Sequence, residues 1–299
     1  MDRPDGHHVV NPAALLGRCT FAPPGSAVRL GVSGGADSLA LLVLATAADL
    51  DVTAVHVDHR LRAGSEAEAE RVAAAADRFG ASFEPHRVDV DDGPNLEARA
   101  RNARLAVLGP GAATGHTADD QAETVLINLL RGAGVDGLAA MRPGPAKPIL
   151  GLRRSETHAL CAALGLDPVV DPSNDDPRFV RNRIRHELIP LAADIAGRDP
   201  VPLLARAAAA ARRHVDHLDR LVDAVDPTDS RGLRAAHDLV AIGALRRWVK
   251  ARRGRPPSVD ELERILDVVH LRRAACELAG GWRLARTDGV LRLEADPRR

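Results

Sequence analysis

Near the start of the chain, six consecutive residues combine the groups that bind phosphate: Ser33, Gly34, Gly35, Ala36, Asp37 and Ser38. Gly34 and Gly35 lack a Cβ, so the chain can turn sharply and bring backbone N–H groups against an anion. The helical pattern that follows adds its positive dipole end, and Asp37 can hold a magnesium ion that bridges phosphate oxygens. A glycine-rich turn without a ligand is the alternative. The Walker A pattern is absent, so the turn is expected to hold a different part of a nucleotide than a γ-phosphate-transferring loop does.

A second group of ionisable residues follows an apolar stretch that ends at Thr114, and consists of His116, Asp119, Asp120 and Glu123. Spacings of four and three place His116, Asp120 and Glu123 on roughly one face of a helix. Thr117 with Asp120 three residues later resembles a capping box, so ordinary capping explains part of the pattern. A histidine beside paired carboxylates exceeds what capping needs. The group is expected to orient a magnesium ion or to deprotonate an incoming amine.

His56 and Asp58 close an apolar run of strand length. Taken alone, the segment fits a solvated loop as well as a binding site. Beside a nucleotide-binding turn its position favours function, and we expect the adenine to be read by the backbone around His56.

Two pairs of arginines lie at helical spacing. Arg101 and Arg104 follow Glu97 on one charged face, for which a solvated ion-pair face is the favoured interpretation. Arg181 and Arg185 lie one turn apart in an arginine-rich segment, where a surface ion-pair helix and a phosphate contact are equally compatible with the pattern.

Apolar runs of strand length alternate with amphipathic helical patterns between residues 28 and 130. Strands are expected at 28–32, 52–57, 83–88 and 112–114, and helices at 38–48, 65–79, 95–108 and 119–130. This alternation predicts an α/β fold with a parallel sheet wrapped by helices. Ligands of such sheets bind beyond the carboxyl ends of the strands. The segments 33–38, 56–62 and 114–120 are therefore expected to line one crevice.

The rest of the chain reads as mostly helical. Beyond a helix at 152–164 capped by Ser155, long helices are expected at 201–225, 239–253 and 259–268. Strand-like runs at 274–278 and 282–293, separated by a Gly280-Gly281 turn, predict a terminal hairpin. We expect two domains, 1–190 and 191–299.

The amino-acid composition restricts the class of protein further. The 299 residues have a formal net charge of zero, but arginines outnumber acids from 178 to 255, which suits a bound polyanion. Only Lys147 and Lys250 are lysines, so arginine counts are weak evidence. Cys19, Cys161 and Cys276 are far apart, and indicate neither a disulfide framework nor an iron–sulfur site. No signal peptide or membrane-spanning run is evident, so we expect a soluble, cytoplasmic protein.

The segment 33–38 resembles the SGGxDS signature of the PP-loop ATP pyrophosphatases. Between residues 28 and 190 the order of motifs resembles the tRNA(Ile)-lysidine synthase family in its shorter form. The segments that match motifs of the family are H-x-D-H-x-L-R at 56–62, N-x-E-A-x-A-R at 95–101, G-H-x-x-D-D-x-x-E-T at 115–124, L-x-R-G-x-G-x-x-G-L at 129–138, D-x-S-N at 171–174 and R-N-x-I-R at 181–185.

This resemblance implies that ATP adenylates O2 of the wobble cytidine of a tRNA(Ile) with a CAU anticodon. Pyrophosphate then leaves on magnesium, and free L-lysine attacks C2 and expels AMP. It also implies roles for the residues above. The turn 33–38 and His56 would bind ATP, with Asp37 on the metal. His116, Asp119, Asp120 and Glu123 would surround cytosine O2 and the amine, and Asp58, Arg101, Arg104, Arg181 and Arg185 would contact tRNA or the adenylate.

Three matters stay open at this stage. Another PP-loop ligase or a tRNA thiolase is the runner-up, although thiolation normally needs paired cysteines. An inactive tRNA-binding relative is the alternative outside enzymes, although none of the motif residues is lost. The sequence does not decide between a monomer and a homodimer. The domain 191–299 is expected to bind tRNA.

Overall fold

The computed structural model describes residues 12–58, 65–88 and 96–295. Contacts between Cα atoms divide the chain into two compact units, residues 1–209 and 210–299. The division falls inside helix α10 (Val201–Asp223), whereas the sequence pattern places a boundary at 190.

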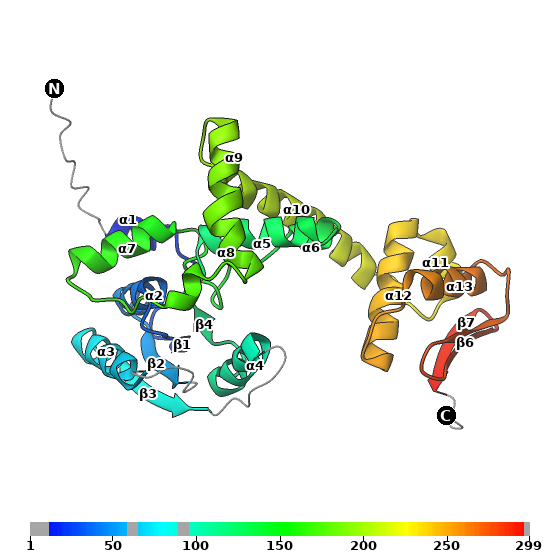
Figure 1. The fold of residues 1–299 in the computed structure, drawn as a ribbon. Helices are drawn as coiled ribbons and strands as arrows, with labels where there is room; N and C mark the ends of the chain where they lie inside the picture. Colours follow the sequence, from blue (N-terminus) through cyan, green and yellow to red (C-terminus); the bar gives the residue numbers. More distant parts are fainter. Residues whose placement is uncertain (1–11, 59–64, 89–95, 296–299) are drawn as a thin grey trace. The chain divides into compact units, whose positions relative to one another are not determined.

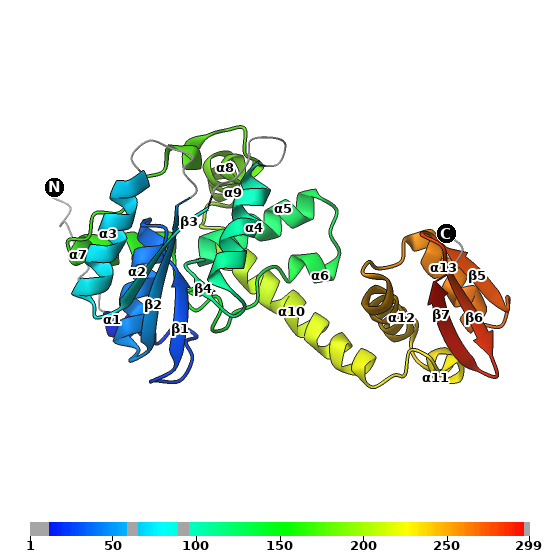
Figure 2. The same ribbon diagram turned by 90° about the horizontal axis from the view of Figure 1, so that it is seen from below.

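The N-terminal unit is built on a four-stranded sheet whose strands run in the order β3-β2-β1-β4. The strands are β1 (Ala27–Gly31), β2 (Asp51–Asp58), β3 (Ser82–Arg87) and β4 (Ala113–Thr114), and all neighbouring pairs are parallel. Helices α2 (Ala36–Ala47) and α3 (Ser65–Arg78) cover one face, and α4 (Leu96–Leu108) covers the other (Figures 1 and 2). The predicted α/β fold with a parallel sheet is confirmed.

The core explains why α2 is apolar on nearly all sides. Leu39, Leu41 and Leu42 are each at most 2% exposed. One side of α2 packs on β1 and β2, while α7 (Arg154–Ala163) packs against α2 through Leu160. A helix buried between a sheet and a second helix has no solvent face and therefore needs no amphipathic pattern.

A helical segment follows the sheet. It contains α5 (Ala118–Leu130), the short α6 (Val135–Leu138), α7, the 3₁₀ turn η1 (Pro172–Asp175), α8 (Val180–Arg183), the π-helical turn η2 (Ile184–Leu188) and α9 (Ile189–Ala196). A short helix α1 (Pro12–Leu16) precedes the sheet. The expected cap at Ser155 is wrong: α7 begins at Arg154, because the Glu156 carboxylate accepts the Arg153 amide at 2.8 Å.

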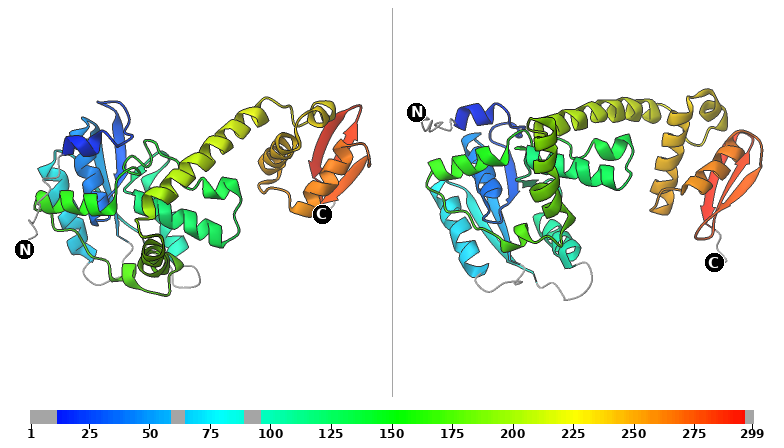
Figure 3. Two further views of the ribbon diagram at one scale, coloured as in Figure 1. Left: turned by 90° about the horizontal axis from the view of Figure 1, so that it is seen from above. Right: turned by 45° about the horizontal axis from the view of Figure 1, so that its top comes forward.

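The C-terminal unit holds α11 (Ser230–Ala235), α12 (Asp238–Arg253), α13 (Val259–Val269) and a three-stranded antiparallel sheet (Figure 3). Its strands are β5 (Ala275–Leu278), β6 (Trp282–Thr287) and β7 (Val290–Ala295). The predicted single strand at 282–293 is wrong. Asp288 (φ 51°) and Gly289 (φ 86°) both adopt positive φ and turn the chain between β6 and β7, as two-residue Asp-Gly hairpin loops do.

Candidate active site

The turn 33–38 joins the carboxyl end of β1 to the N-terminus of α2. Gly34 has φ 88°, and a Cβ there would lie 3.0 Å from Cγ2 of Val169. The Gly34 carbonyl accepts the Val169 amide at 2.9 Å, so the chain after α7 fixes the turn. The Ser38 hydroxyl accepts the Ser33 amide at 3.2 Å and donates to the Gly35 carbonyl at 2.8 Å. These contacts leave the first amides of α2 facing the turn, and a helix N-terminus of this kind can bind an anion.

The second strand end lies directly beside this turn. His56 is 3% exposed, and its Nδ1 lies 2.9 Å from the Val32 carbonyl oxygen, which ties the end of β2 to the residue before Ser33. Nε2 of His56 is buried without a hydrogen-bond partner. Asp58 is also buried at the end of β2. Residues 59–62 of the same predicted segment lie outside the described residues.

The third segment reaches the turn because Gly115 has no side chain. A Cβ on Gly115 would lie 2.6 Å from the Asp37 carbonyl oxygen and 3.0 Å from the Ser38 amide nitrogen. Real Cβ atoms do not approach backbone atoms so closely, so only glycine allows β4 to pass this near to α2. His116 follows, with Nδ1 2.9 Å from the Thr114 hydroxyl oxygen.

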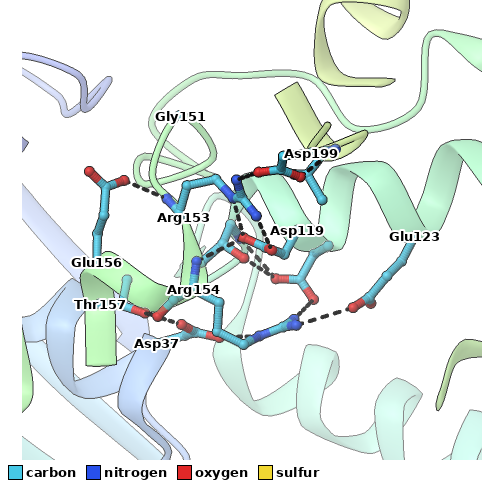
Figure 4. Close-up of polar contacts among 12 residues, drawn as sticks. Asp37, Asp119, Glu123, Gly151, Arg153, Arg154, Glu156, Thr157 and Asp199 are labelled. Atoms are coloured by element: carbon cyan, nitrogen blue, oxygen red, sulfur yellow. Dashed lines mark hydrogen bonds and ion pairs between the residues drawn. The ribbon is translucent and has the colours of Figure 1, made fainter. Parts of the chain in front are cut away.

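Helix α5 presents its carboxylates to the first turn of α7 (Figure 4). Asp119 accepts the Arg154 amide at 2.8 Å and the Arg153 Nε at 3.0 Å. Asp120 accepts the Thr117 amide and hydroxyl, each at 2.9 Å, so the expected capping contact is present as well. Arg153 also pairs with Asp199. The paired carboxylates thus stay charged within a partly enclosed space.

Glu123 is the most deeply buried of these carboxylates, with a fully buried side chain. Arg185 donates to it from Nε at 2.7 Å and from Nη2 at 3.2 Å, and Arg181 Nε lies 3.4 Å from its Oε2. Arg154 Nη1 completes the set at 3.2 Å. A buried carboxylate is tolerated only when cations and hydrogen bonds compensate for its lost hydration, and three arginines do so here.

Arg154 and Thr157 connect this cluster to the nucleotide turn. Thr157 donates a hydrogen bond to the Asp37 carboxylate, and Arg154 Nε lies 3.5 Å from its other oxygen (Figure 4). The same guanidinium contacts Asp120 Oδ1 at 3.1 Å through Nη2. The turn 33–38 and helix α5 therefore both contact the side chain of Arg154.

The surroundings shift the carboxyl groups in opposite directions. Burial raises the pKa of Asp37 above its ordinary value, despite the contacts from Thr157 and Arg154. Burial would also raise the pKa of Asp119, but hydrogen bonds from Arg153 and Arg154 outweigh it and lower that pKa. The pKa of Asp120 is lowered in the same way, because the Arg154 charge and the Thr117 hydrogen bonds outweigh its burial. Asp119 and Asp120 are therefore ionised near neutral pH, and Asp37 ionises less readily.

The structure places most of the predicted residues in one region. The turn 33–38, the helix start at 116–123 and the pair Arg181 and Arg185 converge as described. Arg104 lies on α4, which packs against β1 and β2, and the side chain of Arg101 lies outside the described residues. Sequence reasoning missed Arg153, Arg154 and Thr157. Two adjacent arginines at the start of a helix, one at the N-cap and one at the first helical residue, oppose the helix dipole, and that conflict was the available signal.

Comparisons with known proteins identify the family of the chain. A family model described as the PP-loop domain matches residues 12–192. A tRNA(Ile)-lysidine synthase of Mycolicibacterium paratuberculosis is 39% identical over 291 residues, which cover 89% of this chain and 90% of the relative. One of Rhodococcus erythropolis is 43% identical over 211 residues, which cover 68% of this chain but 65% of the relative, just under two thirds of its length.

A solved structure of a U34-tRNA thiolase from Methanococcus maripaludis is similar at 16% identity, with a TM-score of 0.51 over 69% of this chain and 79% of that one. At that identity the likeness concerns the fold alone. The sheet, the glycine turn and the family match define an ATP-binding protein of the PP-loop class. On the near full-length similarity, the chain belongs to the tRNA(Ile)-lysidine synthase family.

Two absences hold for residues 12–58, 65–88 and 96–295. None of the helices there is long and apolar enough to cross a membrane. No three histidine, cysteine, aspartate or glutamate side chains in that part of the chain are arranged to hold a metal ion.

Proposed function

We propose that this protein ligates free L-lysine to C2 of cytidine 34, the wobble base of a tRNA(Ile) with a CAU anticodon, at the expense of ATP. Membership of the family supports the activity. The observation that carries the mechanism is that Arg154 contacts both Asp37 of the turn 33–38 and Asp120 of helix α5. One motif binds ATP at this place, and the other receives the base that ATP activates.

The turn 33–38 is the proposed site of the ATP phosphates, with the end of β2 near His56 for the adenine. A magnesium ion fits Asp37, because magnesium prefers oxygen ligands and usually takes one or two carboxylates together with substrate phosphates. Asp37 lies in the first turn of α2, directly after the glycines that would hold those phosphates. Bound there, magnesium would neutralise charge on the departing pyrophosphate.

The reaction divides one difficult substitution into two easier ones. In the first step cytosine O2 bonds to the α-phosphorus while the bond to the bridging oxygen breaks, and pyrophosphate leaves with the electron pair. In the second step the lysine ε-amine bonds to C2, and AMP leaves with O2 and its electron pair. The proton of the amine must go to a base. AMP is a much better leaving group than the unmodified carbonyl oxygen O2 of cytosine, which is the purpose of the first step.

The segment 116–123, at the start of helix α5, suits the second step. Asp119 and Asp120, whose pKa values are lowered, supply negative charge that attracts a lysine ammonium group. An ammonium group cannot attack, so a neighbouring group has to remove its proton. Imidazole ordinarily titrates near neutral pH, so His116 is the proposed acceptor of that proton. Glu123 is the proposed anchor of Arg181 and Arg185, because both guanidinium groups pair with its carboxylate.

The remaining basic groups are assigned to the tRNA. Arg101, Arg104, Arg181 and Arg185 with Asp58 are the proposed contacts of the N-terminal unit, and the domain 191–299 is the proposed second tRNA-binding part. Because its substrates are tRNA, ATP and lysine, the protein is expected to act in the cytoplasm.

A defined assay tests the function. Purified protein is incubated with ATP, magnesium, radiolabelled lysine and transcripts of tRNA(Ile) that carry either a CAU or a GAU anticodon. We expect lysine incorporation with release of one pyrophosphate and one AMP, and only with the CAU transcript. Incorporation of sulfur from a sulfide donor instead would favour the thiolase alternative. Tight binding of the CAU transcript without pyrophosphate release would favour an inactive relative.

A further inference from the structure

The guanidinium of Arg154 lies at the centre of the site but belongs to neither motif. It is 3.5 Å from Asp37 on the nucleotide side, and 3.1 Å and 3.2 Å from Asp120 and Glu123 on the helix α5 side. Its side chain is 21% exposed, so part of it remains accessible to a bound substrate. Figure 4 shows the side chain extending from α7 between Asp37 and Glu123.

We propose that Arg154 is a catalytic residue of the adenylation step and binds the α-phosphate as it passes from ATP to cytosine O2. The inference rests on the proposed function. Pyrophosphate is expected at the turn 33–38, and cytosine O2 at the start of α5. The transferred phosphate must then lie between the two, and Arg154 is the cation that contacts residues of both.

Charge gives a second reason. The α-phosphate enters a space bordered by the carboxylates of Asp37 and Asp120, which repel it. A guanidinium placed between the phosphate and these carboxylates offsets this repulsion, and its planar array of N–H donors can reach two oxygens at once. Charge on the phosphate oxygens is redistributed in the transition state, and a fixed cation there lowers the barrier without moving a proton.

The neighbouring Arg153 does not meet these conditions. Its guanidinium is held by Asp119 and Asp199, on the side of the cluster away from Asp37 (Figure 4). Within residues 12–58, 65–88 and 96–295, Arg154 is the arginine whose guanidinium contacts both Asp37 and the carboxylates of α5, so the two adjacent arginines have different roles.

The competing explanation is that Arg154 only neutralises buried carboxylates. Removing a cation from a buried cluster destabilises the fold, so a loss of activity alone does not separate the two roles. Arg154→Lys keeps the charge and loses the fork of donors. Arg183→Lys, at an exposed arginine that pairs with Glu187, is the matched control.

For Arg154→Lys in the full chain we expect a melting temperature within a few degrees of the wild type. Calorimetry is expected to give an unchanged Kd for α,β-methylene ATP, which binds but cannot release pyrophosphate. Single-turnover pyrophosphate release with the CAU transcript should fall on the order of 10²- to 10³-fold, and the KM for lysine should stay the same. Arg183→Lys should match the wild type in every measurement.

Arg154→Ala provides an independent readout, because added methylguanidinium should restore part of its pyrophosphate release. Wild-type pyrophosphate release by Arg154→Lys would overturn the inference. So would a defect confined to lysine attack, or to stability and ATP binding. If the wild type itself releases no pyrophosphate with the CAU transcript, the proposed function fails, and that result is distinct from a defect of the variant.

Discussion

Asp37 keeps an acidic group at a place where burial opposes its charge. Because burial raises its pKa in the folded state, the ionised carboxylate costs folding free energy above that pKa. The cost disappears as the pH falls below the ordinary pKa of an aspartate, since the group is then protonated in both states. Under the proposed function this carboxylate binds magnesium, although its charge lowers the stability of the fold.

The variant Asp37→Asn tests whether the charge of Asp37 costs stability and is needed for activity. The amide oxygen of the new side chain can still accept the Thr157 hydroxyl, so we expect a higher melting temperature than the wild type at pH 7 and no difference at about pH 3. Tested with the CAU transcript, pyrophosphate release should fall on the order of 10²-fold or more. Asp51→Asn, at an exposed residue where β2 begins, should change neither property. A lower melting temperature for Asp37→Asn at pH 7 would contradict the burial argument.

Individual residues differ in how well the sequence predicts them. The turn 33–38 and the pattern 116–123 are local, so their chemistry can be read from spacing. Arg154 acts through residues 31 to 117 positions away in the chain, and no local pattern specifies such contacts. The partners of Glu123 are likewise distant in the chain: the pattern around Arg181 and Arg185 fitted an ion-pair helix and a phosphate contact equally, and it did not specify this buried carboxylate as their partner.

At the scale of elements, β4 and α2 lie close together because Gly115, the residue after β4, has no side chain. Gly115→Ala would place a Cβ 2.6 Å from a backbone oxygen of α2, where no flexible side chain can give way. We expect a loss of about 1–3 kcal/mol in the free energy of unfolding and a large loss of pyrophosphate release, because the α5 carboxylates move away from the turn.

Gly17→Ala is the control for that experiment, because a Cβ there meets nothing closer than 3.8 Å and the backbone is not strained. Chemical denaturation measures both variants. Equal stabilities for the two would show that β4 shifts without cost, and would sink this explanation of the glycine.

The C-terminal unit depends on one buried ion pair that joins α12, α13 and the end of β5. The side chains of Arg253 and Glu261 are 2% and 7% exposed. Glu261 accepts two bonds from Arg253 at 2.8 and 2.9 Å, one from the Ser258 amide at 2.8 Å and one from the Ala279 amide at 2.7 Å. The Arg253 hydrogen bonds hold the pKa of Glu261 well below its usual range.

Glu261→Gln should therefore destabilise this unit by about 3–5 kcal/mol, because it leaves the buried Arg253 without a counter-charge. In the wild type, the lowered pKa of Glu261 means that its ionised carboxylate stabilises the folded state. The stabilisation is complete above the ordinary value of 4.5, and is lost as the pH falls below it. Hydrogen exchange of residues 258–279 in the full chain measures the effect, with the exposed Glu263→Gln as control. Unchanged protection in Glu261→Gln would refute it.

Elements were easier to predict than their boundaries. The strands and helices of the parallel sheet lie within a few residues of the expected ranges, because apolar runs and turn residues mark them in the chain. The hairpin between β6 and β7 was missed although Asp288-Gly289 is a strong turn signal. The apolar alternation is in fact interrupted there by the polar residues Arg286, Thr287 and Asp288, and it resumes with the opposite phase at Leu291 and Leu293. The reversal was therefore marked in the sequence, and treating 282–293 as one strand ignored it.

Across the whole molecule, charge is unevenly shared. Residues 1–209 carry 22 arginines and lysines against 27 acids, whereas residues 210–299 carry 19 against 14. The neutral total therefore conceals an acidic catalytic unit and a basic C-terminal unit. A tRNA is a polyanion, so the basic unit is the expected source of salt-dependent affinity.

One cleft of the C-terminal unit is the best place to test this. It has a volume of about 530 Å³ and is lined by Arg264, Arg273, Ala275, Cys276, Glu277 and Arg283. Arg264→Ala and Arg283→Ala should each weaken binding of the CAU transcript, and each should reduce the slope of log Kd against log salt by about one. Both should leave binding of α,β-methylene ATP unchanged. Arg247→Ala is the control, because Asp219 and Asp223 already neutralise that arginine. If the control reduces the slope as much as the cleft variants do, the unit attracts RNA through its overall charge and this cleft has no special part in binding.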